Sequence, residues 1–154
     1  EILSNKVDLA VSVLPLEHIN LEVQSFRSGR MVCVIPDLHP LAPKQKISLE
    51  DLSQYELISH HPSIQFGKLV RTAFESAGLA FNSRIHIHQT EVACSLVRAG
   101  MGVAIVDEFT VSNGAWVGLQ VRPLEQDILL KPSIARSVFD RQGTHAEKFI
   151  EILH

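Results

Sequence analysis

The hydrophobic and polar positions of this chain follow two different periods. Val7–Val13 and Met31–Ile35 are nearly continuous apolar runs, which is typical of strands that are buried on both faces. Arg84–His88 alternates instead, with isoleucines on one face and His86 and His88 on the other. Shorter apolar or alternating runs predict further strands at 21–25, 57–59, 103–106, 119–121 and 128–135, the last interrupted by Pro132.

Apolar residues with a helical period lie between these predicted strands. In Gln65–Ala77 they recur at helical spacing up to Gly78, and a second such helix begins at Thr90 and ends at Gly100. Shorter helices are predicted at 48–55, with Ser48 as its N-cap and Asp51 at its third position, at 108–111 and at 144–153. Strands that alternate with helices indicate the α/β class, with mostly parallel strands.

The composition is that of an ordinary globular protein. A length of 154 residues gives one domain or two small lobes, and 45% hydrophobic residues are enough for a core. The net charge of −3, without a run of Lys or Arg, lacks the basic footprint of a nucleic-acid surface. Cys33 and Cys94 lie in apolar runs, which predicts buried, reduced thiols. No apolar stretch approaches the roughly 20 residues of a membrane span, and the opening EILSNK is not a signal peptide, so we expect a cytoplasmic protein.

Two segments carry a family resemblance. They are Val7–Ala42, which contains DLAVSVLPLEH and SGRMVCVIPDLHPLA, and Val92–Val111, which contains ACSLVRAGMGVAIVDEFT. Together they resemble the effector-binding domain of LysR-type transcriptional regulators. The LPLEH and SGR pieces are closest to the branch with the opine-responsive regulators and the diaminopimelate-responsive regulator of lysine biosynthesis, whereas HPLA is common to the whole family. The resemblance therefore implies an amino acid or an opine as the effector.

The resemblance also implies a fold and an organisation. We expect a type II periplasmic-binding-protein-like domain, in which two crossover strands join two α/β lobes and a small ligand binds in the cleft between them. Residues 30–126 would form the second lobe, and residues 1–29 and 127–154 an incomplete first lobe. The DNA-binding domain would lie outside this chain. The protein would form a homodimer or tetramer, in which Gln65–Ala77 and Arg84–His88 contribute to the dimer interface.

Ligands in such folds bind at the carboxyl ends of strands and at the starts of helices. This rule selects four places as the candidate ligand site, and their residues are Val13, Leu14, His61, Ser63, Ile64, Gln65, His88, Thr90, Asp107 and Phe109. The start of the helix at Gln65 favours an anion such as a carboxylate, and the acidic Asp107–Glu108 pair could hold an ammonium group. Simpler roles stay open, because Ser63 and Thr90 could be helix caps and the two acids could be solvated residues of a helix's first turn.

The motifs of other functional classes are absent from the sequence. His60–His61 and His86–His88 could converge, but neither cysteine lies near them, so we expect no metal site. The sequence has no G-x-S-x-G, HExxH or P-loop, and Gly100 and Gly102 lie between a helix and a strand, the wrong order for a dinucleotide fingerprint. We therefore expect no catalytic residues and no cofactor. The leading interpretation is a ligand-sensing regulatory domain. The alternatives are the solute-binding protein of a transporter and an enzyme with a similar two-lobed fold.

Overall fold

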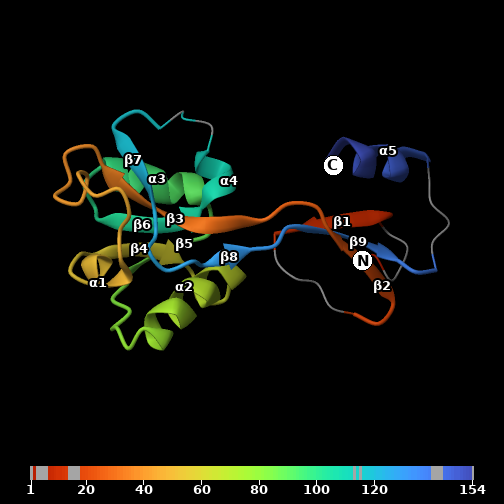
Figure 1. Cartoon of the computed structure of the whole chain (residues 1–154), viewed down its shortest axis with the longest axis horizontal. Helices are drawn as coiled ribbons and strands as arrows, with labels where there is room; N and C mark the ends of the chain where they lie inside the picture. The colour runs from red at the N-terminus through yellow and green to blue at the C-terminus, as the bar shows by residue number, and fades with distance from the viewer. Residues whose placement is uncertain are drawn as a thin grey trace. The chain divides into compact units, whose positions relative to one another are not determined.

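The computed structural model describes residues 2, 7–13, 18–112, 114, 116–139 and 144–153. The chain divides into two compact units, Glu1–Gly29 with Leu130–His154, and Arg30–Leu129. Each unit is built around a β-sheet (Figure 1). Within the described residues, none of the helices is both long enough and apolar enough to span a membrane.

The smaller unit holds an antiparallel sheet in the order β1-β9-β2. Its strands are β1 (Leu9–Ser12), β9 (Ser133–Ser137) and β2 (Leu21–Ser25), and helix α5 covers Thr144–Leu153. The expectation that Val7–Val13 is buried on both faces is wrong, since Val7 is 38% and Val11 49% exposed. Within the described residues β1 pairs only with β9, which makes it an edge strand of this sheet. Strand side chains point to the two faces of a sheet, so the exposure of Val11 shows that its face is only partly covered.

The larger unit contains a mixed sheet in the order β5-β4-β6-β3-β7, and the short β8 (Leu129–Leu130) also pairs with β3. The strands β4 (Leu57–His60), β5 (Ile85–Ile87) and β6 (Val103–Asp107) are parallel, with β4 in the middle. β3 (Gly29–Pro36) runs antiparallel to both β6 and β7 (Leu119–Pro123), so β7 points in the same direction as β4, β5 and β6. The prediction of mostly parallel strands therefore holds for the direction of four strands in the order β5-β4-β6-β3-β7, and β3 is reversed.

Helices follow the parallel strands and lie on opposite faces of the sheet (Figure 1). α2 (Gln65–Ser76) connects β4 to β5, and α3 (Thr90–Arg98) connects β5 to β6. Gly78 and Gly100 follow these helices with φ of 70° and 78°, so the predicted glycine stops are confirmed. The remaining helices of this unit are α1 (Leu49–Leu52) and α4 (Glu108–Val111).

Local interactions and burial confirm two further predictions. At α1 the Asp51 N–H donates to Ser48 Oγ at 3.0 Å and the Ser48 N–H donates to Asp51 Oδ2 at 3.2 Å, which forms a capping box. Cys33 and Cys94 are free thiols buried in the core. Burial raises the pKa of both thiols, that of Cys94 to about 11, so both stay protonated and unreactive near neutral pH.

Candidate functional site

The three parallel strands bring most of the predicted site to one edge of the larger sheet. β4 ends at His60, β5 at Ile87 and β6 at Asp107, and parallel strands end at the same edge. The chain leaves β4 toward β5 on one side and returns to β6 on the other, so the order reverses between β4 and β6. Such a topological switch point, at the carboxyl ends of the strands, is where open α/β sheets bind ligands.

The loop from His61 to Gln65 forms one side of this edge. The Ser63 hydroxyl lies 2.7 Å from His61 Nδ1, and the Ser63 N–H donates to the same nitrogen at 3.1 Å. The N-cap of α2 is Ile64, whose side chain cannot accept a hydrogen bond, so the interpretation of Ser63 as the cap is wrong by one residue. The first N–H groups of α2 consequently have no side-chain cap and point out of the helix start, where they can receive an anion.

Gly67, in the first turn of α2, lets this helix start lie directly on the chain that leaves β4. A Cβ added to Gly67 would lie 2.4 Å from the carbonyl oxygen of His61 and 2.5 Å from that of His60, far inside normal contact. Only a glycine therefore allows this approach. Gly67 does not stand out in the sequence, because the helical spacing of the larger apolar residues around it is the stronger signal.

A cluster of buried polar residues lies at this edge of the sheet, and we call it the floor of the candidate site. It consists of His60, Thr90 and Asp107, all at most 5% exposed. The Thr90 hydroxyl donates to Asp107 Oδ2 at 2.7 Å, and His60 Nε2 lies 3.4 Å from the same hydroxyl oxygen. The single hydroxyl proton of Thr90 is used in the hydrogen bond to Asp107. The Thr90 oxygen therefore accepts a hydrogen bond from an N–H at His60 Nε2. The interpretation of Thr90 as a helix cap is wrong, since Gln89 is the N-cap of α3.

This geometry fixes the state of His60. Burial lowers its pKa below the usual value, while the negative charge of Asp107 opposes that shift. A neutral ring with its proton on Nε2 leaves Nδ1 as an acceptor, and Nδ1 has no hydrogen-bond partner in the part of the chain that the structure describes. The neighbouring Ser59 Oγ is buried and unpartnered in the same sense. Neither atom was singled out from the sequence, which pointed to His60 only as one of the histidines that could converge.

The two acidic residues at the end of β6, Asp107 and Glu108, have different hydrogen-bond partners. Asp107 Oδ1 accepts from the N–H and the hydroxyl of Thr110, both at 2.9 Å, so Asp107 is the N-cap of α4. Glu108 Oε1 accepts the Arg30 N–H at 3.1 Å. Asp107 is therefore a buried structural carboxylate, and the interpretation of it as a solvated acid is wrong.

Of the histidines that could converge, His61 lies close to both His86 and His88. The ring centre of His61 lies 5.6 Å from that of His86 and 5.5 Å from that of His88. His86 and His88 are exposed, opposite the side chains of Ile85 and Ile87. Among the described residues, no group of three or more histidine, cysteine or acidic side chains is placed to hold a metal ion.

The other predicted residues lie apart from this cluster or outside the described chain. Phe109 is half-buried in α4. Val13 follows β1 in the smaller unit, and Leu14 lies outside the described residues. A role for Val13 and Leu14 in ligand binding therefore stays a prediction.

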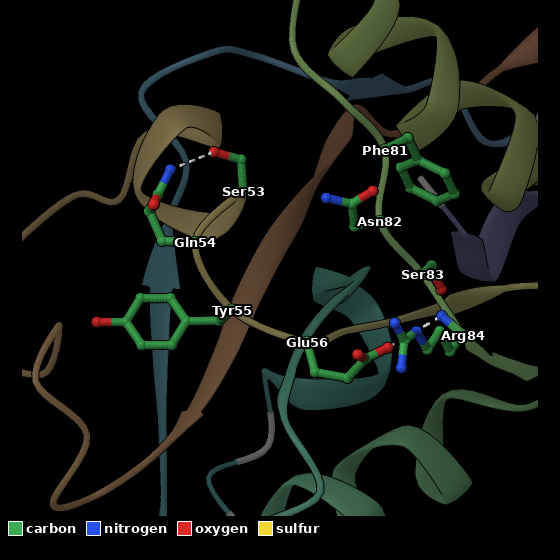
Figure 2. Close-up of a pocket in the computed structure, with 8 residues that line it drawn as sticks. All are labelled: Ser53, Gln54, Tyr55, Glu56, Phe81, Asn82, Ser83 and Arg84. Atoms are coloured by element: carbon green, nitrogen blue, oxygen red, sulfur yellow. Dashed lines mark hydrogen bonds between the residues drawn. The ribbon is translucent and has the colours of Figure 1, made fainter.

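A hollow lies at the opposite edge of the larger sheet, where β4 and β5 begin. It has a volume of about 450 Å³ and is lined by Ser53–Glu56 and Phe81–Arg84 (Figure 2). Glu56 Oε1 accepts the Arg84 N–H at 3.0 Å there. Because this hollow lies at the amino ends of the strands, it is distinct from the candidate site.

Comparisons with known proteins agree with this architecture. The LysR substrate binding domain family model matches residues 1–154. Regulatory protein NocR of Agrobacterium tumefaciens (strain T37) is 35% identical over 103 residues, which are 67% of this chain and 34% of that protein. Transcriptional activator protein LysR of Escherichia coli (strain K12) is 31% identical over 91 residues, 59% of this chain and 29% of that protein. The chain thus spans about a third of the length of these curated relatives.

Solved structures show the same fold. The Synechocystis PCC6803 CcmR regulatory domain, solved in complex with 2-PG, aligns with a TM-score of 0.85 at 23% identity, covering 99% of this chain and 74% of that one. At this identity the likeness establishes the fold and no ligand. The match of the family model over the whole chain shows that this protein belongs to the LysR substrate-binding domain family, with its type II periplasmic-binding-protein-like fold.

Proposed function

We propose that this chain is the effector-sensing part of a LysR-type transcriptional regulator and that it binds a small, amino-acid-like effector at the carboxyl edge of β4, β5 and β6. The observation that carries the proposal is the convergence at this edge of an uncapped helix start with polar side chains from three strands. Family membership supports the sensing role, and the resemblance to the opine and diaminopimelate branch supports the effector class.

The chemistry of the edge suits a ligand with charges of both signs. A carboxylate would accept from the N–H groups at the start of α2, with Ser63 and Gln65 beside it. His60 Nδ1, an acceptor without a partner in the described chain, would accept a hydrogen bond from an ammonium or hydroxyl group that reaches the buried cluster. His61, His88 and Thr90 complete the proposed set. The expectation that Val13 and Leu14 contact the ligand from the first lobe stays part of the proposal.

Control of transcription would be a property of the full-length regulator. The effector would act by binding one arrangement of the regulator more tightly than another, because a ligand shifts an equilibrium only by its differential affinity. DNA would be contacted by a part of the regulator outside this chain. Subunits would pair through α2 and the neighbouring β5, as the resemblance implies, in the cytoplasm.

The rival functions are less well supported. The relatives described above are named as a regulatory protein and a transcriptional activator, which favours regulation over solute transport. An enzyme would need a group poised to attack or to move a proton. The hydroxyl of Thr90 instead donates a hydrogen bond to Asp107, which is itself the cap of α4.

The test is effector binding to the full-length regulator by calorimetry, after a thermal-shift screen of amino acids and opines. Ser63→Ala and Gln65→Ala should each weaken binding by about 1–2 kcal/mol, the usual loss of one hydrogen bond to a charged group. Because Ser63 is not the cap of α2, its replacement should change stability by less than about 0.5 kcal/mol. Ser95→Ala and Gln54→Ala, two exposed positions away from the edge, are the matched controls. Unchanged affinity in both edge variants would show that the proposed site is wrong.

A further inference from the structure

The hydrogen bonds in the floor of the candidate site run in one fixed direction. An ionised Asp107 can only accept, so the Thr90 hydroxyl, 2.7 Å from Asp107 Oδ2, must be the donor of that bond. The Thr90 oxygen, 3.4 Å from His60 Nε2, is left as an acceptor, and the ring proton of His60 therefore lies on Nε2. We call this series of hydrogen bonds from Asp107 through Thr90 to His60 the hydrogen-bond relay.

His60 Nδ1 is the open end of the hydrogen-bond relay. A neutral imidazole has a proton on only one nitrogen, so Nδ1 is an acceptor and cannot donate. Burial lowers the pKa of His60, which keeps the ring neutral near neutral pH. Nδ1 has no partner in the part of the chain that the structure describes, and His60 is only 2% exposed, so little solvent can reach it. A buried acceptor in this state gains stability only from a group that donates to it.

This open acceptor is a neighbour of the start of α2. The ring of His60 packs edge-on against that of Phe66, with 5.1 Å between the ring centres, and Phe66 is the second residue of α2. Phe66 is only half-buried. The N-cap of the same helix, Ile64, makes no side-chain hydrogen bond, so the first N–H groups of α2 can bind an anion. A site for a carboxylate and an acceptor for a neighbouring donor group are therefore combined at one strand end.

We propose that the hydrogen-bond relay selects effectors with a donor on the carbon next to a carboxylate, such as α-amino and α-hydroxy acids, and rejects α-keto acids. This selectivity rests on the proposed function, because it concerns the same site. The carboxylate would bind at the start of α2, and the ammonium or hydroxyl group would enter beside Phe66 and donate to His60 Nδ1. An α-keto acid would place a carbonyl oxygen there, and two acceptors repel each other. Thr90 and Asp107 would be positioning residues that fix the ring proton of His60.

L-lactate and pyruvate are the smallest probes of this selectivity. They have the same carbon skeleton and the same charge, and they differ only in the group next to the carboxylate. The experiment is a titration of the ¹⁵N-labelled chain, in which the amides of 63–67 report binding at the start of α2. We expect L-lactate to bind about fivefold more tightly than pyruvate, the usual contribution of one hydrogen bond. L-alanine should also bind, and acetate, which has no group at this position, should resemble pyruvate.

The ¹⁵N resonances of the His60 ring test the hydrogen-bond relay separately from affinity. Protonated and unprotonated imidazole nitrogens have well-separated resonances, so the position of the ring proton can be measured. We expect the proton on Nε2 in the free chain. Binding of L-lactate should shift the Nδ1 resonance in the direction of an accepted hydrogen bond, whereas pyruvate should leave it unchanged.

Asp107→Asn should reverse the hydrogen-bond relay. An amide nitrogen in place of Oδ2 would donate to the Thr90 oxygen, Thr90 would donate to His60 Nε2, and the ring proton would move to Nδ1. The preference for L-lactate should then be lost or inverted. Asparagine is a good N-cap and its oxygen can still accept the Thr110 N–H, so α4 should keep its start. Thr110→Val, which removes the other hydroxyl that donates to Asp107, is the matched control and should keep the parent's preference.

The outcomes separate the selectivity from the effector site itself. Equal binding of L-lactate and pyruvate at the amides of 63–67 would overturn the selectivity and leave the effector site standing. No shift there with any of the four probes would overturn both proposals. A ring proton on His60 Nδ1 in the parent chain would overturn the selectivity, as would a folded Asp107→Asn that keeps the parent's preference. If Asp107→Asn did not fold, the two measurements on the parent chain would still decide.

Discussion

Replacement of Gly67 by alanine tests how the candidate site is built. In the interior of a helix this change usually stabilises a protein by about 1 kcal/mol, because glycine is a poor helix former. Here the added Cβ would lie 2.4 Å and 2.5 Å from the carbonyl oxygens of His61 and His60, whereas ordinary contact begins at 3.4 Å. The start of α2 would have to move away from the end of β4 by about 1 Å. We therefore expect the opposite sign, a loss of stability.

The magnitude follows from two opposing contributions. Over-packing costs about 1–3 kcal/mol, and the upper end applies because both contacts are with backbone atoms, which cannot rotate away. Subtracting about 1 kcal/mol for helix propensity leaves a net loss of about 2 kcal/mol. For a chain of this length that corresponds to a fall in Tm of about 4–8 °C.

Urea unfolding followed by circular dichroism measures this difference directly. Lys68, the next residue of the same helical turn, is exposed and supplies the control. Lys68→Ala should be more stable than Lys68→Gly by the propensity difference alone. If Gly67→Ala were as stable as the parent protein or more so, the close approach of α2 to the carbonyl groups of His60 and His61 would be refuted. The displaced helix start should also weaken effector binding in the full-length protein.

Two further measurements probe the buried floor. Thr90→Val keeps the shape of the side chain but removes the donor to Asp107, and should destabilise the protein by about 1–3 kcal/mol; no change in urea unfolding would argue against the observed hydrogen bond. Burial lowers the pKa of His60 in the folded protein, so the unfolded chain takes up the proton first and stability should fall as pH drops below about 6.5. His60→Gln should flatten this fall, although His39, whose pKa burial also lowers, should retain part of it; a variant with the parent's full pH dependence would exclude His60 as a source.

The periodic parts of the sequence predicted the fold of the larger unit well. Gln65–Ala77 was predicted as a helix and α2 covers Gln65–Ser76, because a strong helical period and a glycine stop are both local signals. The break at Pro132 likewise separates β8 from β9. The rule that ligands bind at the carboxyl ends of strands selected an edge whose side chains do converge. These successes depend on residues near one another in sequence and on a general rule of topology.

The predictions that were wrong or missing concern hydrogen-bond partners and packing neighbours, which a local sequence pattern does not specify. Ser63 and Thr90 have the chemistry of helix caps, but each hydroxyl serves another partner. Ser63 lies next to the ring of His61, and Thr90 donates to Asp107, 17 positions later in the chain. The exposure of Val11 in β1 depends on what packs over the face of the sheet, and the need for Gly67 depends on a backbone that belongs to another element. Apart from Ser63, whose partner is two residues away, each requires knowledge of tertiary partners.

The buried cluster has a consequence for how a ligand could be sensed. His60 ends β4, Thr90 begins α3 and Asp107 ends β6, so their hydrogen bonds tie three elements together beneath the proposed site. Gly67 fixes the start of α2 against the same strand end. An edge held in this way is organised before a ligand arrives, and binding there costs little local ordering. The differential affinity that regulation needs must then come from groups outside this network that touch the ligand in only one state of the regulator. We therefore expect variants of Thr90 to alter stability and affinity together, whereas variants that change regulation alone should map outside this network.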